Sequence, residues 1–278
     1  MSNLYKVACI GTGFMGSALI RGIAKKIDVK NLFITDFSLE KAKKIADSIN
    51  CVCEKSNRKV VEKADIIFLA VKPPTIQSVI EDIADLLSSK IIISVAAGIS
   101  LEAMYQFYEE GLRKQNISSF NASLPIVRLM PNLPVIIGEG MIGLCHRNVD
   151  TKIISTIVTL LEATGRIEIV DEKLMDVVTA VSGSGPAYVA LFVEAMADAA
   201  VKLGMTRDKA YIYACQTLKG SATYLLNTEQ HPGILKDAVC SPSGTTIAAI
   251  EALEKTGFRS SLMSGITASY NRSVELGQ

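Results

Sequence analysis

Length, composition and charge indicate a globular protein and exclude several other classes. The 278 residues are 49% hydrophobic and 21% charged, which is enough apolar material for one large or two ordinary domains. A net charge of +1 indicates no excess of positive charge that would attract nucleic acid or an anionic membrane. The longest apolar runs, IIFLAV and IIISVAAGI, are too short to span a bilayer. We therefore expect a cytoplasmic protein with neither nucleic acid nor membrane as a partner.

The first part of the chain alternates apolar runs with helical patterns. YKVACI, NLFITDF, IIFLAVK and IIISVAAG resemble strands, and helical patterns begin near Ser17, Ser38, Pro74 and Ser100. Near-continuous apolar strands separated by helices predict a parallel sheet that is covered on both faces. Residues 1–168 are therefore expected to form an α/β Rossmann domain with a doubly wound, mostly parallel sheet.

After about Asp171 every pattern is helical, and Gly204 and Gly257 mark expected helix ends. Residues 169–278 are expected to form an all-α domain that binds substrate. This part is rich in Ala, Gly and Ser and is apolar for its size, which favours dimerisation through it.

Six cysteines are scattered along the chain without a metal-type spacing. Cys51 and Cys53 are one residue apart and have no matching Cys or His pair elsewhere. We expect reduced, mostly buried thiols and no metal site.

A glycine-rich turn, Gly11-Thr12-Gly13-Phe14-Met15-Gly16, follows the first predicted strand and opens a helix. In this context the first glycine allows a tight turn, the second lets the backbone approach a pyrophosphate, and the third lets helix and strand pack closely. The pyrophosphate is expected at the helix N-terminus.

The ends of three further predicted strands carry candidate cofactor residues. Asp36 ends the second strand, where an acidic residue would bond the adenosine ribose and repel a 2′-phosphate, although Ser38 could still accept a phosphate nearby. Ala70-Val71-Lys72-Pro73 and Val95-Ala96-Ala97-Gly98 end strands at the same carboxyl edge. Lys72 would lie over the cleft, and the small side chains of the second segment would leave room for a nicotinamide.

A polar loop, Ser241-Pro242-Ser243-Gly244-Thr245-Thr246, precedes a late apolar helix. Its hydroxyls could simply cap that helix, or the loop could bind an anion. The two histidines, His146 and His231, show no carboxylate at a spacing typical of a catalytic dyad. A protonated imine is already electrophilic and needs no such acid–base group, so the pattern favours an imine substrate whose carboxylate binds at this loop.

Nearly the whole chain resembles the pyrroline-5-carboxylate reductase family. The resemblance depends on GTGFMG, AVKPP, SVAAG, RLMPNLP, SGSGPAYVALFVEAMADAAVKLGM, EQHPGILKDAVCSPSGTTIAAIEALE and GFRSSL. It implies reduction of 1-pyrroline-5-carboxylate to L-proline by hydride transfer from NADPH or NADH, in a homodimer that is interlocked through its helical domain and often assembled into decamers.

The resemblance also implies residue roles. Ser241, Gly244, Thr245 and Thr246 would bind the substrate from a partner chain, with Thr246 as the catalytic residue that bonds the imine nitrogen. The residues implied or expected at the cofactor are Gly11, Gly13, Phe14, Met15, Gly16, Asp36, Ser38, Asn57, Ala70, Val71, Lys72, Pro73, Ala97 and Gly98.

Three departures from the family pattern bear on specificity. Asp36-Phe37-Ser38 stands where the family often has Asn-Arg-Ser/Thr or Thr-Pro-Ser, and predicts use of NADH at least as well as NADPH. Leu133 replaces a threonine and Ser243 a glycine.

Three functions remain as alternatives to reduction of 1-pyrroline-5-carboxylate. They are a reductase of a related cyclic imino acid, a β-hydroxy-acid dehydrogenase of similar architecture, and a non-catalytic dinucleotide-sensing protein.

Overall fold

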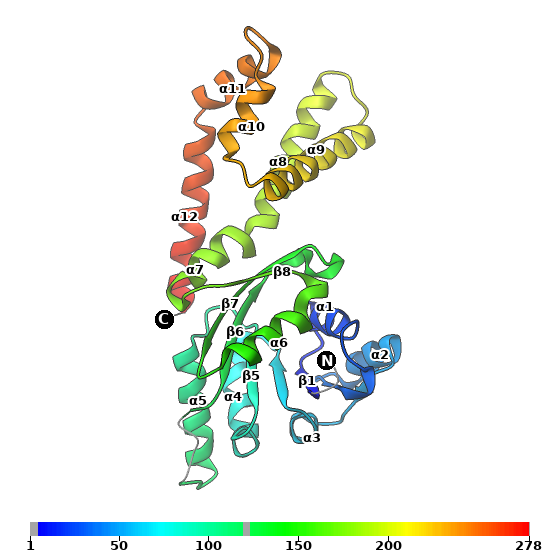
Figure 1. Ribbon diagram of the computed structural model, residues 1–278, viewed down its shortest axis with the longest axis vertical. Coiled ribbons are helices and arrows are strands. Elements are labelled where there is room, and N and C mark those ends of the chain that lie inside the picture. Colours follow the sequence, from blue (N-terminus) through cyan, green and yellow to red (C-terminus); the bar gives the residue numbers. More distant parts are fainter. Residues whose placement is uncertain (1–4, 119–122, 278) are drawn as a thin grey trace. The chain divides into compact units, whose positions relative to one another are not determined.

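Contacts divide the chain into two units, Met1–Ser184 with Tyr270–Gln278, and Gly185–Ser269. The computed structural model describes residues 5–118 and 123–277 (Figure 1). This division falls later than the expected boundary at 168/169. The reason is that Val178 packs on Gly143 and Gly183 on Met130, which keeps the segment after residue 169 with the first unit.

The first unit is built on one eight-stranded sheet with the strand order β3-β2-β1-β4-β5-β6-β7-β8. All neighbouring strands are parallel except β6 and β7, which are antiparallel. The strands are β1 (Val7–Ile10), β2 (Leu32–Thr35), β3 (Val52–Cys53), β4 (Ile66–Leu69), β5 (Ile91–Ser94), β6 (Ile126–Pro131), β7 (Gly140–Arg147) and β8 (Gly165–Ile169). The predicted doubly wound, mostly parallel sheet is therefore confirmed, and its chain order reverses between β1 and β4.

Helices cover both faces of this sheet because its strands are apolar on both sides. The helices are α1 (Phe14–Ile23), α2 (Leu39–Ile49), α3 (Asn57–Lys63), α4 (Pro73–Ile83), α5 (Leu101–Lys114), α6 (Thr151–Leu161) and α7 (Met175–Val178). One core contains side chains of α1, α2 and α6, and the other contains side chains of α3, α4 and α5. Strand β1 contributes Val7 and Cys9 to the first core and Ala8 and Ile10 to the second.

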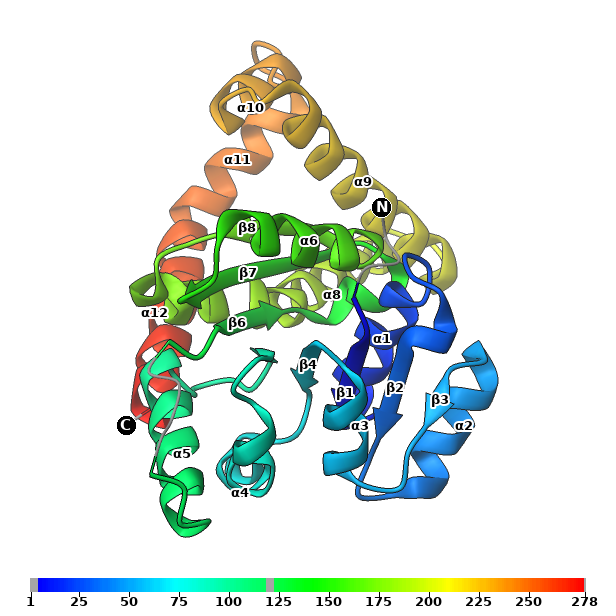
Figure 2. The same ribbon diagram turned by 60° about the horizontal axis from the view of Figure 1, so that its bottom comes forward.

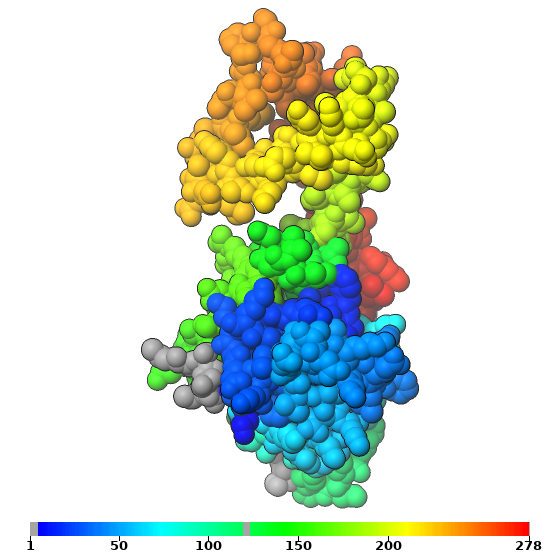
Figure 3. Space-filling view, turned by 90° about the vertical axis from the view of Figure 1, so that its right-hand side faces the viewer, coloured from blue at the N-terminus to red at the C-terminus, as the bar shows by residue number. Residues whose placement is uncertain are grey.

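The pictures follow this arrangement. Figure 2 shows β1, β2 and β3 side by side, with α2 beside β3. In the space-filling view of Figure 3, the N-terminal segments in blue and light blue, which include α1 and α2, lie on the face of the first unit that is turned toward the viewer. These segments carry the glycine-rich turn and the end of β2.

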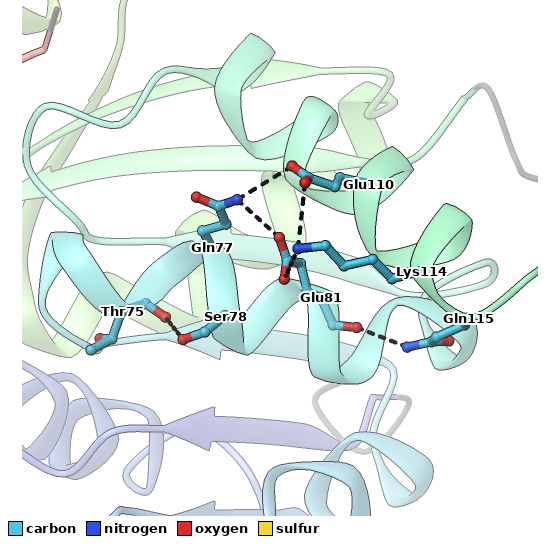
Figure 4. A network of polar contacts seen from close by, with 7 residues as sticks. All are labelled: Thr75, Gln77, Ser78, Glu81, Glu110, Lys114 and Gln115. Carbon is cyan, nitrogen blue, oxygen red and sulfur yellow. Dashed lines mark hydrogen bonds and ion pairs between the residues drawn. The ribbon is translucent and has the colours of Figure 1, made fainter.

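Helices α4 and α5 cross closely and are joined by a polar network (Figure 4). A Cβ at Gly111 would lie 2.7 Å from the Cα of Glu81, so glycine is required at the crossing. Lys114 Nζ donates to Glu81 Oε2 at 2.8 Å, and Gln77 Nε2 donates to Glu81 Oε1 at 2.9 Å. The bond from Lys114 holds the pKa of the Glu81 carboxyl below its ordinary value. We assign this network a structural role.

The second unit consists of helices only. It contains α8 (Gly185–Lys202), α9 (Arg207–Thr228), α10 (Pro232–Val239), α11 (Thr245–Lys255) and the larger part of α12 (Phe258–Leu276). Gly204 and Gly257 follow α8 and α11 with φ of +101° and +79°, which confirms both expected helix ends.

This unit has almost no apolar core of its own. Its buried residues are three alanines, Ala197, Ala210 and Ala214, whereas Leu191 and Ile212 are 68% and 67% exposed. A 31-residue helical stretch, Glu172–Lys202, is long and apolar enough to cross a membrane by length and composition alone. Such exposed apolar surface in a helical unit is typical of an interface between subunits.

The cysteines are all free thiols, as expected. The expectation that most of them are buried is wrong, because only Cys9 and Cys145 are buried and Cys215 is exposed on α9. The exposed position of Cys215 follows from the thin core of the helical unit. Among the described residues no cluster of His, Cys, Asp and Glu could hold a metal ion.

Candidate active site

The glycine-rich turn after β1 is packed so closely that two of its residues must be glycine. Gly11 has φ +101°, and a Cβ there would lie 2.5 Å from the carbonyl oxygen of Ala70. A Cβ at Gly16 would collide with the carbonyl oxygen of Gly11. The buried Cys9 thiol donates to that same oxygen at 3.4 Å, and its pKa is raised by burial, so it stays a protonated donor.

Gly13 has a different environment from the other two glycines. It is exposed, it is the N-cap residue of α1, and a Cβ there would meet nothing within 4 Å. No side chain caps α1. The first amides of this helix therefore face open space, which fits the anionic pyrophosphate of a dinucleotide.

Asp36 lies directly after β2, as predicted, and its carboxylate is held by three hydrogen bonds. Oδ2 accepts from the Thr12 amide at 2.6 Å and from the Thr12 hydroxyl at 3.0 Å, and Oδ1 accepts from the Ser38 amide at 2.9 Å. The Ser38 side chain makes no cap bond to α2, although Ser38 is the N-cap residue as expected. The carboxylate thus links the glycine-rich turn to the end of β2.

The remaining cofactor candidates follow parallel strands and so lie at one edge of the sheet. Lys72 is exposed at the N-cap of α4, and Pro73 is the first residue of that helix. Asn57 begins α3, and Ala97 is exposed next to Gly98, which has φ +77°. The structure therefore places every predicted cofactor residue within the first unit at or beside this edge.

Two features of this edge were not predicted from the sequence. Asn132 follows β6, donates from Nδ2 to the carbonyl oxygen of Ser182 at 3.1 Å, and accepts from the Met141 amide at 2.9 Å. It thereby joins the sheet to a π-helical turn, Thr179–Gly183, a form that is frequent at functional sites. The RLMPNLP motif was a signal for Asn132, but its contact with Ser182 is long-range.

The end of α12 also lies at this edge. A Cβ at Gly98 would lie 3.4 Å from the carbonyl oxygen of Leu276. The Ser273 hydroxyl, which is buried, donates to Asp176 Oδ1 at 2.6 Å and fixes the helix end on the first unit. No local pattern in the sequence signals this contact.

The polar loop before α11 lies in the second unit. Gly244 is the N-cap residue of α11, and no side-chain hydrogen bond caps this helix. The Gly244 amide donates to the Ser241 carbonyl oxygen at 3.0 Å, which closes a turn in which Ser243 has φ +56°. The structure therefore does not support the interpretation that the loop's hydroxyls cap α11.

Neither histidine is part of a dyad. His231 is the N-cap residue of α10, and its Nδ1 accepts from the Gly233 amide at 3.1 Å. His146 is exposed on β7. Within the described residues neither imidazole contacts a carboxylate, and His231 serves as the cap of a helix.

Comparisons with known proteins agree with this arrangement. A family model described as NADP oxidoreductase, coenzyme F420-dependent, matches residues 6–98, and a model for pyrroline-5-carboxylate reductase dimerisation matches residues 172–276. The pyrroline-5-carboxylate reductase of Methanosarcina acetivorans is 37% identical over an alignment 277 residues long, which covers 98% of each chain.

Solved structures give the same result. The pyrroline carboxylate reductase of Plasmodium falciparum with NADP bound has a TM-score of 0.85 at 33% identity and covers 100% of both chains. The pyrroline-5-carboxylate reductase of Coxiella burnetii has a TM-score of 0.90 at 32% identity and covers 99% of this chain and all of that one. The chain therefore belongs to the pyrroline-5-carboxylate reductase family.

Proposed function

We propose that this protein reduces 1-pyrroline-5-carboxylate to L-proline with NADPH or NADH, the last step of proline biosynthesis. One observation carries the choice of substrate. The first turn of α11 begins at an uncapped glycine within a loop of hydroxyl side chains, which suits a small carboxylate. The membership in the reductase family supports the same substrate.

The first unit supplies the cofactor site in this proposal. When bound, the reduced dinucleotide supplies a hydride to the C=N carbon of the substrate. Gly13 and the first amides of α1 would hold the pyrophosphate, Asp36 the adenosine ribose, and Ala97 with Gly98 would leave room for the nicotinamide. Lys72 adds a positive charge at the same edge.

Substrate binding is assigned to Ser241, Gly244, Thr245 and Thr246. The amides at the start of α11 would hold the carboxylate, and the half-buried Thr246 would hydrogen-bond the ring nitrogen. Positioning of this kind suffices for a protonated imine, which is already electrophilic. The absence of a carboxylate partner for either histidine among the described residues favours this chemistry over alcohol oxidation.

The assembly we propose is a homodimer through the helical unit, with a decamer as the next level of assembly. In this homodimer the loop 241–246 binds substrate beside a cofactor held by the partner chain. Residues 1–168 are assigned to cofactor binding and 169–278 to substrate binding and dimerisation. The thin core of the helical unit and the match of residues 172–276 to a dimerisation model support self-association. Six free thiols accord with a cytoplasmic location.

Asp36 supports use of NADH at least as well as NADPH, because a carboxylate at the ribose repels a 2′-phosphate. Steady-state kinetics with 1-pyrroline-5-carboxylate and each cofactor test the function and this preference together. We expect turnover with both cofactors. Turnover of another imine without turnover of 1-pyrroline-5-carboxylate would refute the substrate, and a KM for NADPH far below that for NADH would refute the preference.

A further inference from the structure

The C-terminal end of α12 contacts the loop of residues 95–100, which follows β5. A Cβ at Gly98 would lie 3.4 Å from the carbonyl oxygen of Leu276, and a Cβ at Gly277 would lie 3.2 Å from the carbonyl oxygen of Gly98. The contact is therefore made by backbone atoms. Because no side-chain rotamer can absorb a movement of the helix end, such a movement is passed directly to the loop.

Other contacts hold the two ends of this loop. The Ala96 amide donates to the hydroxyl oxygen of Ser94, a buried residue of β5, at 3.2 Å. At the other end the Leu101 amide, the first of α5, donates to Glu172 Oε1 at 2.7 Å. Gly98 lies between these two anchors, with φ +77°. The end of α12 thus supports the loop at its tip, where neither anchor reaches.

A short hydrogen bond holds the last turns of α12 against α7. The Ser273 hydroxyl is buried and donates to Asp176 Oδ1 at 2.6 Å. Figure 1 shows the C-terminal end of α12 beside α7. Asp176 has a rigid base, since its neighbour Met175 is fully buried in the core of the first unit. A hydroxyl bond to a carboxylate is stronger than one between neutral groups, so this bond fixes where α12 ends.

We propose that Asp176 and Ser273 are positioning residues for hydride transfer, which act through the end of α12 on the tip of the loop 95–100. This inference rests on the proposed function, in which Ala97 and Gly98 leave room for the nicotinamide. Neither Asp176 nor Ser273 would touch cofactor or substrate. Their bond would set the position of the surface against which the nicotinamide ring lies.

This arrangement should affect the rate of the reaction and not the affinity for the cofactor. The pyrophosphate and the ribose are assigned to the glycine-rich turn and Asp36, which are held by bonds of their own. A displaced loop tip would leave those contacts in place. Transfer between two carbons requires close approach and correct orientation, so even a small shift of the ring lowers the rate steeply.

Single-turnover oxidation of bound NADH by saturating 1-pyrroline-5-carboxylate tests the inference. The rate constant reports hydride transfer, and the amplitude reports the fraction of competent sites. We expect Asp176→Ala and Ser273→Ala each to lower the rate constant about tenfold, with the amplitude and the calorimetric dissociation constant of NADH nearly unchanged. Deuterium at the transferred position of NADH should slow both variants further, which would identify hydride transfer as the affected step.

Three further variants separate the bond from other effects. Asp176→Asn keeps an oxygen that can accept from the Ser273 hydroxyl, so it should restore most of the rate. The double variant Asp176→Ala with Ser273→Ala should be no slower than either single one, because each removes the same bond. Arg272→Ala is the matched control, since Arg272 bonds Glu275 at 2.8 Å on the exposed surface of the same helix end, and it should leave the rate constant unaltered.

Four results would overturn the inference. Unchanged rate constants in both alanine variants are the first, and a lower amplitude with an unchanged rate constant is the second, because it would limit the bond to a role in stability. The third is an Asp176→Asn rate as low as that of Asp176→Ala, and the fourth is an equal loss in Arg272→Ala. If the protein reduces another imine and not 1-pyrroline-5-carboxylate, the proposed substrate fails, and the same measurements with that imine still test Asp176 and Ser273.

Discussion

Asp36 and Thr12 are joined by two hydrogen bonds, from the Thr12 amide at 2.6 Å and from its hydroxyl at 3.0 Å. Thr12 lies between Gly11 and Gly13, so the carboxylate that would select the cofactor also holds the turn that would bind the pyrophosphate. Cofactor choice and the shape of the glycine-rich turn would therefore be coupled in this chain, and substitutions at Asp36 and Thr12 would separate the two effects.

Removing the charge of Asp36 should shift cofactor preference. In Asp36→Ser the repulsion of a 2′-phosphate is lost, so we expect the ratio of kcat/KM for NADPH to that for NADH to rise at least about tenfold, which corresponds to about 1.4 kcal/mol. Thr12→Val is the control, because it removes only the hydroxyl bond and keeps the carboxylate. It should lower the affinity for both cofactors together, and an unaltered ratio in Asp36→Ser would contradict the assignment.

Two glycines of the same turn should respond to alanine in opposite ways. Gly13→Ala meets open space, so the free energy of unfolding should change by less than about 1 kcal/mol while cofactor affinity falls sharply. Gly16→Ala forces a Cβ against the Gly11 carbonyl oxygen and should destabilise the fold by about 1–3 kcal/mol. Urea unfolding and calorimetric titration with ADP-ribose measure the two effects. Equal destabilisation by both variants would show that Gly13 has a packing role.

Substitutions at Thr246 and His231 should have different effects, the first on catalytic activity and the second on stability. Thr246→Val removes a hydroxyl that we assign to the substrate, so kcat/KM for 1-pyrroline-5-carboxylate should fall about ten- to a hundredfold while cofactor affinity is kept. His231→Ala removes the cap of α10 and should cost about 1 kcal/mol of stability with kcat nearly unchanged. Loss of turnover in His231→Ala without loss of stability would restore the histidine as an acid–base candidate.

Ser243 occupies a backbone conformation that favours glycine. Its φ of +56° lies in the left-handed region, and its turn is closed by the Gly244 amide and the Ser241 carbonyl oxygen. We expect Ser243→Gly to stabilise the protein by about 1 kcal/mol or less and Ser243→Ala to leave stability nearly unchanged. Urea unfolding of the dimer at fixed protein concentration measures this. A rise in the KM for 1-pyrroline-5-carboxylate in both variants would show that the Ser243 hydroxyl contacts the substrate.

The sequence predicted the parts of the fold that are encoded locally. Strands β1, β2, β4 and β5 are continuous apolar runs, and Asp36 could be placed because the glycine motif has a known spacing to the end of the next strand. Strands β3, β6 and β8 were not predicted; β3 has only two residues, and β8 is half exposed with mixed composition. Short or mixed strands carry too little periodicity to be recognised without their neighbours.

Site residues could be predicted from the sequence where a local motif identifies them. They could not be predicted where their position depends on a contact with a residue far along the chain. Gly11 and Gly13 follow from a motif, whereas the contact of Asn132 with Ser182 joins segments 50 residues apart. The contact of Ser273 with Asp176 joins segments 97 residues apart. The contact-based division at Ser184 likewise depends on a long-range contact, because Val178 packs on Gly143 in the first unit.

Burial of the Cys145 thiol should make stability depend on alkaline pH. Desolvation, with a smaller contribution from Glu172, raises the pKa of this thiol from its ordinary value to about 12. The folded state therefore retains the proton where the unfolded state loses it. The stabilisation is fully present below about pH 9, and it is lost as the pH rises toward 12, at about 1.4 kcal/mol per pH unit.

Cys145→Ala removes this titration, so its free energy of unfolding should fall less steeply between pH 9 and 10.5 than that of the unsubstituted protein. Cys215→Ala is the matched control, because it makes the same substitution at an exposed cysteine. Urea unfolding at half-unit pH steps measures both slopes. Identical slopes of unfolding free energy against pH in Cys145→Ala and the unsubstituted chain would contradict this prediction. They would mean that the Cys145 thiolate is solvated or paired with a cation in the folded state, because only then would it ionise equally in the folded and unfolded states.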